Sequence, residues 1–165
     1  MNASPALLGR AEALLAACRA KQWRVTTAES CTGGLVAALL TEIAGSSDVV
    51  ECGFVTYSNA AKAEMLGVDL GLIEAKGAVS EEVARAMAEG ALARSGADLA
   101  VAITGIAGPG GATATKPVGL VHFGLATRGQ PTRRLERRYG ELGRGAVREA
   151  AVSDALGLLL EAAVA

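Results

Sequence analysis

The sequence predicts an α/β fold, a three-layer α/β/α sandwich with a mixed, mainly parallel sheet of about five strands. Two observations indicate this fold class. Strand-like and helix-like segments alternate through the first two-thirds of the chain, which favours parallel strands joined by right-handed crossovers. After the fourth strand-like segment, the turn Arg128-Gly129-Gln130-Pro131 indicates an antiparallel hairpin at one edge of the sheet.

The first half of the chain contains two expected strands and three expected helices. Leucine and alanine recur on one face of the first helix, and a β-branched and aromatic run indicates the second strand. Ser58 and Asn59 begin the third helix, and Gly67 ends it. In chain order, these elements are helix 5–21, strand 24–28, helix 35–44, strand 49–57 and helix 60–66.

The second half begins with a well-marked helix. Ser80 is a good N-cap, and Glu81 and Glu82 follow it at the positive end of the helix dipole. The next strand is nearly all apolar, which indicates burial on both faces. In chain order, these elements are helix 81–94, strand 98–104, a Gly- and Pro-rich loop 105–117, strand 118–127, strand 132–139 and helix 144–163.

The composition predicts a single domain over residues 1–165, because a chain of this length forms one core by default. Half of the residues are apolar and few are aromatic, which suits helices that pack closely on a sheet. The net charge of −1 gives no electrostatic reason to expect nucleic acid or an anionic membrane as a partner. We therefore expect neither.

The sequence shows no sign of secretion or membrane insertion. No apolar run approaches the roughly 20 residues that span a bilayer, and residues 1–8 lack the zones of a signal peptide. The cysteines Cys18, Cys31 and Cys52 are odd in number and lack metal-ligand spacing. We expect a reduced, cytoplasmic protein with neither a disulfide framework nor a metal site.

Polar or glycine-rich sequence follows three of the expected strands. Ser30 follows the first strand, residues 57–62 follow the second, and residues 104–111 follow the third. Each stretch alone also suits an ordinary βα turn with a capping Ser or Thr. Ligands bind beyond the carboxyl ends of parallel strands, so the three stretches together predict a functional site at this edge.

Ser30 and Lys62 are the best candidates for nucleophile and base. A Ser-His-Asp arrangement is disfavoured, because the only histidine, His122, lies in mid-strand, where a packed or surface imidazole is expected. Lys62 lies in the first turn of a helix, where the helix dipole disfavours a charged ammonium. Tyr57 could orient a proton or could simply pack.

Cys31 is a rival nucleophile, because a thiol at a helix N-terminus can have a depressed pKa. It also lacks a histidine partner, and a packing role is favoured. A cysteine-based amidase stays as an alternative.

Three features could hold an anion. Helix N-termini and glycine-rich loops present N–H groups, so residues 31–34 and 105–111 are candidates for holding an oxyanion or a phosphate. Arg144 and Arg148 lie one turn apart on the last helix and could bind a phosphate, although such arginines are usually solvated. The run 133–138 is interpreted as a charged edge that discourages aggregation.

With these residues identified, the sequence resembles the CinA C-terminal domain family, whose stand-alone members are bacterial nicotinamide-nucleotide amidases. Because the resemblance covers nearly all of the 165 residues, we expect no nucleotide-processing domain of the kind that precedes it in full CinA proteins. The segments that show the likeness are Thr27-Ala28-Glu29-Ser30-Cys31-Thr32-Gly33-Gly34, Gly53-Phe54-Val55-Thr56-Tyr57-Ser58-Asn59, Ala61-Lys62, Gly77-Ala78-Val79-Ser80, Thr104-Gly105-Ile106-Ala107-Gly108-Pro109-Gly110-Gly111 and Lys116-Pro117-Val118-Gly119.

The resemblance implies hydrolysis of the carboxamide of nicotinamide mononucleotide to nicotinic acid mononucleotide and ammonia, without a metal or other cofactor. It implies that Ser30 is the nucleophile, that Lys62 is its base and that Tyr57 belongs to the site. It also implies the α/β/α sandwich and a homo-oligomer, with a dimer favoured. The residues expected to contact substrate are Cys31, Thr32, Gly33, Gly34, Thr104, Gly105, Gly108 and Arg144.

One region departs from the family pattern. The family usually has a Gly-Asp-Arg-type turn before the last helix, and here the sequence reads Glu141-Leu142-Gly143-Arg144. Arg148 is therefore the second candidate for the phosphate contact. A role outside enzymology also stays open, as a non-catalytic nucleotide-binding or interaction module, in which Lys62 would be dispensable.

Overall fold

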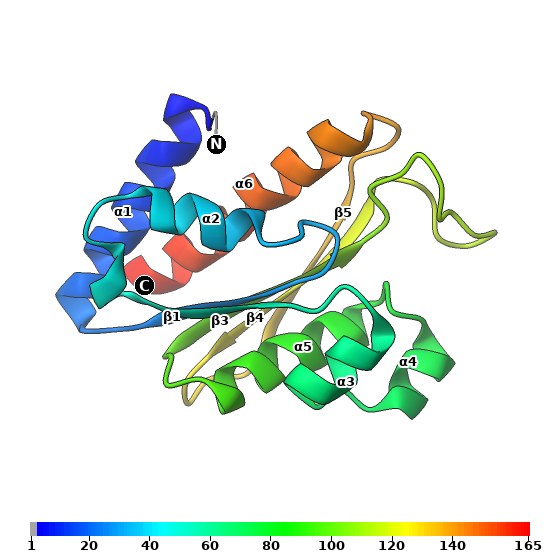
Figure 1. The fold of residues 1–165 in the computed structure, drawn as a ribbon, viewed down its shortest axis with the longest axis horizontal. Coiled ribbons are helices and arrows are strands. Elements are labelled where there is room, and N and C mark those ends of the chain that lie inside the picture. The colour runs from blue at the N-terminus through cyan, green and yellow to red at the C-terminus, as the bar shows by residue number, and fades with distance from the viewer. Residues whose placement is uncertain (1–2) are drawn as a thin grey trace.

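The computed structural model describes residues 3–165, which form a five-stranded sheet with helices on both faces (Figure 1). The strands are β1 (Val25–Glu29), β2 (Val50–Val55), β3 (Leu99–Gly105), β4 (Leu120–Thr127) and β5 (Arg133–Arg138). The helices are α1 (Pro5–Lys21), α2 (Leu35–Glu42), α3 (Asn59–Leu66), α4 (Leu70–Lys76), α5 (Glu81–Arg94) and α6 (Arg144–Val164), with a short 3₁₀ helix, η1 (Ser46–Asp48).

The strand order is β2-β1-β3-β4-β5. β1 pairs in parallel with both β2 and β3, whereas β4 is antiparallel to β3 and to β5. β4 is therefore the one strand of the sheet that runs in the opposite direction, and the predicted mixed, mainly parallel sheet is confirmed. The carboxyl ends of β1, β2, β3 and β5 lie at one edge, where α6 also begins.

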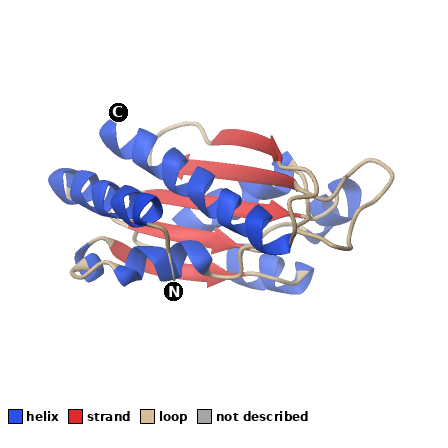
Figure 2. Ribbon diagram, turned by 90° about the horizontal axis from the view of Figure 1, so that it is seen from above, coloured by secondary structure: helices blue, strands red, loops and turns tan. Residues whose placement is uncertain are grey.

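Each face of the sheet is covered by three helices. α1, α2 and α6 lie on one face and α3, α4 and α5 on the other (Figure 1), and α1 and α6 lie above the strands in Figure 2. Two separate apolar clusters fill the spaces between the layers. β1 and β4 are buried along their whole length, as is β3 up to Gly105. The predicted three-layer sandwich is thus confirmed.

All ten expected helices and strands are present, with ends that differ by at most two residues from those expected. α2 ends earlier than expected, at Glu42, because η1 follows it. Helix α4 was not predicted. Of its seven residues only Ile73 is buried, so its apolar periodicity is weak. The main sequence signal for this helix is its N-cap Asp69, whose side chain accepts a hydrogen bond from Leu72 N–H.

The arginines of β5 connect this edge strand to both helical layers. Arg133 and Arg137 pair with Glu161 and Asp154 of α6, at 2.8 and 2.9 Å. Arg134 points to the other face and pairs with Glu81 of α5 at 2.7 Å. The predicted charged edge is confirmed, and these cations already have partners. Among residues 3–165, no helix is both long and apolar enough to cross a membrane.

Gly90 of α5 tests the packing between α5 and α3. A Cβ at this position would overlap the Leu66 carbonyl oxygen, whereas one at Gly157 of α6 would meet open space. Although alanine is favoured over glycine in helices by about 1 kcal/mol, we expect Gly90→Ala to lower the free energy of unfolding by about 2 kcal/mol. Urea unfolding measures this change. Gly157→Ala is the matched control and should be neutral or stabilising, and an equal loss in both variants would contradict the packing argument.

Candidate active site

Ser30 lies at the carboxyl end of β1, in the centre of the parallel part of the sheet. Its N–H donates to the Ile103 carbonyl of β3 at 2.9 Å, and the Glu29 carbonyl accepts from Thr56 N–H at 2.9 Å. The backbone of this residue is therefore held from both neighbouring strands, so the position of its hydroxyl is fixed by the sheet rather than by a mobile loop.

Lys62 reaches Ser30 from the first turn of α3. The Ser58 side chain accepts from Ala61 N–H at 3.0 Å and so caps this helix directly after β2. The Lys62 side chain is buried, and its Nζ lies 3.0 Å from Ser30 Oγ. Nζ also donates to the Thr56 carbonyl at 2.8 Å and lies 3.5 Å from the Tyr57 carbonyl. The structure thus brings together the two residues that the strand ends predicted.

The surroundings of Lys62 favour a neutral amine. Burial lowers the pKa of Lys62, and the interaction with Cys31 acts in the opposite direction. A neutral lysine has two N–H groups and one lone pair. The lysine Nζ donates to Ser30 Oγ when it is charged, but a neutral amine whose two N–H groups are directed to the carbonyls of Thr56 and Tyr57 has its lone pair left to accept the Ser30 Oγ–H. This arrangement suits a general base.

Cys31 does not have the properties of an activated nucleophile. Its side chain is buried, and burial raises the pKa of the thiol to about 11. The thiol is therefore protonated near neutral pH, because burial outweighs the nearby Arg148 and Lys62, which act to lower the pKa of the thiol. This finding disfavours the cysteine-based alternative and agrees with the predicted packing role.

Glu29, one residue before the nucleophile, holds the start of α2. Its carboxylate is buried and accepts three backbone hydrogen bonds, from Gly34 and Val36 at 3.1 Å and from Ala37 at 2.9 Å. Three N–H groups that a helix N-terminus leaves unpaired are therefore occupied by the protein itself. The sequence predicted an anion site at this N-terminus, but no local motif in it signals that Glu29 binds these N–H groups.

The turn after Ser30 keeps two unpaired donors. Gly33 N–H donates to the Ser30 carbonyl at 3.0 Å, and Leu35 N–H donates to the Thr32 carbonyl at 3.3 Å. Within the described chain, the N–H groups of Cys31 and Thr32 have no protein acceptor. Gly33 and Gly34 have φ values of +62° and +97°, which L-residues with a side chain rarely adopt. These glycines therefore shape the turn.

Ser30 opens into a hollow of about 220 Å³ at the carboxyl edge of the sheet. Arg144 of α6 lies at this hollow, and its guanidinium donates to Tyr57 Oη at 2.9 Å and to the Gly108 carbonyl at 2.9 Å. The glycine-rich loop after β3 supplies one wall and continues outward beyond the sheet (Figures 1 and 2). The lining residues are Ser30, Cys31, Tyr57, Gly105, Ile106, Ala107, Gly108, Gly110, Gly111 and Arg144.

Several expected contact residues lie outside this lining. Thr104 is buried, and its Oγ1 donates to the Ala78 carbonyl at 2.7 Å, which ties β3 to the Gly77-Ala78-Val79-Ser80 segment. Thr32 is buried, while Gly33 and Gly34 lie in the turn described above. Substrate contacts from these four residues stay predictions.

His122 and Arg148 also have defined surroundings. His122 is buried on β4 with Nε2 3.9 Å from Glu136, and burial lowers the pKa of its imidazole. It is a packed residue, as expected. Arg148 donates to the carbonyls of Cys31 and Thr32, so its guanidinium is engaged with the turn. Across residues 3–165, no group of three or more His, Cys, Asp or Glu is placed to hold a metal ion.

The fold and the site define a class of protein, a three-layer α/β domain in which a buried lysine contacts a partly exposed serine at the carboxyl edge of its sheet. Residues 9–163 match the family described as "CinA C-terminal domain", and the chain belongs to this family. A solved structure of the competence/damage inducible protein CihA from Agrobacterium tumefaciens has 50% sequence identity and a TM-score of 0.94, over 98% of each chain.

Curated relatives differ in name and in length. A "Nicotinamide-nucleotide amidohydrolase PncC" from Enterobacter agglomerans is 60% identical over 111 residues, which are 67% of this chain and 68% of that protein. A "CinA-like protein" from Mycolicibacterium vanbaalenii is 60% identical over 139 residues, 84% of this chain. The match covers only 32% of that longer relative.

Glu29→Gln tests the role of the buried carboxylate. Glutamine keeps the shape, but its amide N–H₂ would face backbone N–H groups in place of one carboxylate oxygen. We expect the free energy of unfolding to fall by about 2 kcal/mol, since at least one N–H group is left without an acceptor. Urea unfolding is the measurement. Glu42→Gln, at the exposed carboxyl end of the same helix, is the control and should change stability by less than about 0.5 kcal/mol. Equal effects would argue against this role.

Proposed function

We propose that this chain is an amidohydrolase that converts nicotinamide mononucleotide to nicotinic acid mononucleotide and ammonia, with Ser30 as nucleophile and Lys62 as base. The observation that carries the proposal is the 3.0 Å contact between Ser30 Oγ and the buried Lys62 Nζ. The 60% identity to a protein named as a nicotinamide-nucleotide amidohydrolase supports the substrate.

In the first step, Lys62 Nζ takes the proton of Ser30 Oγ, and Oγ attacks the carboxamide carbon. The negative charge that develops on the amide oxygen needs donors that already point toward it. Cys31 N–H lies directly beside the nucleophile, and the glycine-rich loop offers further N–H groups along the same hollow. Each such donor is expected to contribute about 3 kcal/mol to transition-state stabilisation.

The second step completes the reaction. The Lys62 ammonium returns its proton to the leaving nitrogen, the carbon–nitrogen bond breaks, and ammonia leaves an acyl ester on Ser30. Lys62 Nζ then takes a proton from a water molecule, and the hydroxide oxygen attacks the ester carbon. The ester bond breaks, Lys62 returns the proton to Ser30 Oγ, and the carboxylic acid product leaves and releases its own proton to water.

Arg144 is the proposed contact for the substrate phosphate. It is exposed, it lies on the lining of the hollow, and a guanidinium matches the geometry of phosphate oxygens. The Oη of Tyr57 accepts a hydrogen bond from the Arg144 guanidinium and so orients it.

We also propose that the protein acts in the cytoplasm. We further propose that it is a homo-oligomer, and analytical sedimentation would test this oligomeric state.

The alternative of a non-catalytic binding module explains the hollow and Arg144 but not Lys62. A binding module gains nothing from a lysine that is buried against a serine hydroxyl and that, in the described part of the chain, has no carboxylate partner. The contact between Lys62 and Ser30 therefore favours the enzyme.

Removing either member of the pair tests the mechanism. We expect Ser30→Ala and Lys62→Met each to lower kcat for ammonia release from nicotinamide mononucleotide by about 1000-fold or more, because each removes a step of the reaction. Coupled detection of ammonia measures the rate, and circular dichroism checks the fold. Ser47→Ala and Lys21→Met, both exposed and distant in the fold, are matched controls. Near-normal turnover by Ser30→Ala would refute the nucleophile, and a wild-type protein that binds the nucleotide without releasing ammonia would favour the binding module.

The pH dependence of kcat/KM reports on Lys62. The base must be neutral, so activity should rise with pH through the pKa of Lys62. Burial lowers that pKa from its ordinary value of 10.5, and the midpoint of the rise should therefore lie below 10.5. A pH profile measured at low substrate concentration gives this midpoint. A rise centred at or above 10.5 would contradict the desolvated base.

A further inference from the structure

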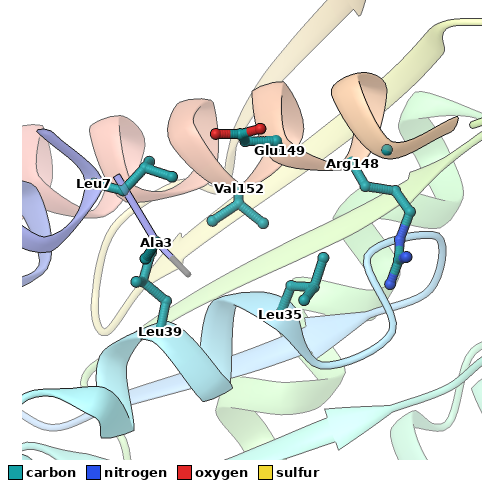
Figure 3. Close-up of a pocket in the computed structure, with 8 residues that line it drawn as sticks. Ala3, Leu7, Leu35, Leu39, Arg148, Glu149 and Val152 are labelled. Carbon is teal, nitrogen blue, oxygen red and sulfur yellow. The ribbon is translucent and has the colours of Figure 1, made fainter. Parts of the chain in front are cut away.

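Arg148 approaches the nucleophile turn from the opposite helical layer to Lys62. It lies on α6 and is partly buried, with Nε 3.1 Å from the Cys31 carbonyl and Nη2 3.0 Å from the Thr32 carbonyl. Figure 3 shows its side chain extending from α6 toward the loop that precedes α2. It lines a second hollow, of about 270 Å³, together with Leu35 and Leu39 and apart from Ser30.

These two hydrogen bonds fix the orientation of the peptide groups that follow the nucleophile. A trans peptide places its N–H opposite its carbonyl. Because the Thr32 carbonyl points to Arg148, Gly33 N–H points the other way, where it donates to the Ser30 carbonyl at 3.0 Å. The Ser30 carbonyl is thereby directed into the turn, so Cys31 N–H points out of it.

The result is a chain of hydrogen bonds that runs from a cation to the nucleophile. It passes from the Arg148 guanidinium to the Thr32 carbonyl, and from Gly33 N–H to the Ser30 carbonyl. It ends at Cys31 N–H, which has no acceptor within residues 3–165 and belongs to a residue that lines the hollow with Ser30. Hydrogen bonds in such a chain polarise one another, so the terminal N–H becomes a stronger donor.

We propose that Arg148 is a positioning residue that orients and polarises the Cys31 N–H as an oxyanion donor, and that it does not bind the substrate phosphate. The proposal deepens, and rests on, the proposed amidase function. It assigns separate tasks to the two arginines of α6. Arg144 lies on the lining of the active-site hollow, whereas the guanidinium of Arg148 donates to the backbone carbonyls that follow the nucleophile.

The two roles predict different kinetics. An oxyanion donor acts mainly in the transition state, so its loss lowers kcat, whereas loss of a phosphate contact raises KM. We expect Arg148→Met to lower kcat by about 10- to 100-fold with little change in KM. Arg144→Met should mainly raise KM. Arg148→Lys should recover part of kcat, because an ammonium can still donate to these carbonyls but lacks the fixed fork of a guanidinium.

The experiment measures kcat and KM for ammonia release from nicotinamide mononucleotide in these three variants and in the wild-type protein. Arg10→Met is the matched control. Arg10 also ties α6 to another element, through Ser153 Oγ at 2.8 Å, but does not contact the turn. Its kcat should equal that of the wild type. A rise in KM with unchanged kcat in Arg148→Met would overturn the positioning role, as would an equal loss of kcat in Arg10→Met.

Hydrogen exchange separates failure of this proposal from failure of the proposed function. If the wild-type protein releases no ammonia, the amidase function fails, and exchange in the peptide that covers residues 30–36 still tests the Arg148 contact. Faster exchange there in Arg148→Met, with α1 unchanged, supports the contact. Unchanged exchange in that peptide contradicts it. Arg148→Lys gives the same readouts if Arg148→Met does not fold.

Discussion

The site depends on the burial of Lys62, whose ammonium has no carboxylate partner among residues 3–165. Removing an ammonium from water is unfavourable unless a counter-charge is present, and here the groups around Nζ are a hydroxyl and backbone carbonyls. The balance therefore shifts toward the neutral amine. This chemistry requires α3 to begin immediately after β2, because only then do the Thr56 and Tyr57 carbonyls lie within reach of a lysine in the first helical turn.

The reversal of β4 determines what else can reach this edge. Because β4 runs against the other strands, β5 returns to the same direction as β3 and ends at the same edge as β1. α6 consequently begins beside the hollow, and both of its first arginines reach site components. The ion pairs of Arg133 and Arg137 hold β5 against α6, so the charged edge strand also fixes the helix that supplies these arginines.

The sequence was sufficient to predict the fold class, ten elements and the pairing of Ser30 with Lys62, because strand ends in a parallel sheet meet at one edge and their polar side chains are visible in the sequence. Glu29 and Arg148 were not predictable in their actual roles. Both side chains form hydrogen bonds with backbone groups. Every residue has such groups, so the sequence contains no partner residue of a particular type that would indicate the contact. Helix α4 was missed for a different reason, since a single buried residue gives no periodicity.

Glu29 and Arg148 together explain how a turn that contains two adjacent glycines can keep the nucleophile in a fixed position. Glycine gives the turn its left-handed conformation but leaves the backbone with more freedom than any other residue would. The Glu29 carboxylate accepts hydrogen bonds from the N–H groups on the helix side of the turn. The Arg148 guanidinium donates hydrogen bonds to the carbonyls that follow Ser30. The N–H groups left over are those of Cys31 and Thr32, within the described residues. Two charged side chains from different elements thus restrict the turn and leave free only the donors nearest the reacting oxygen.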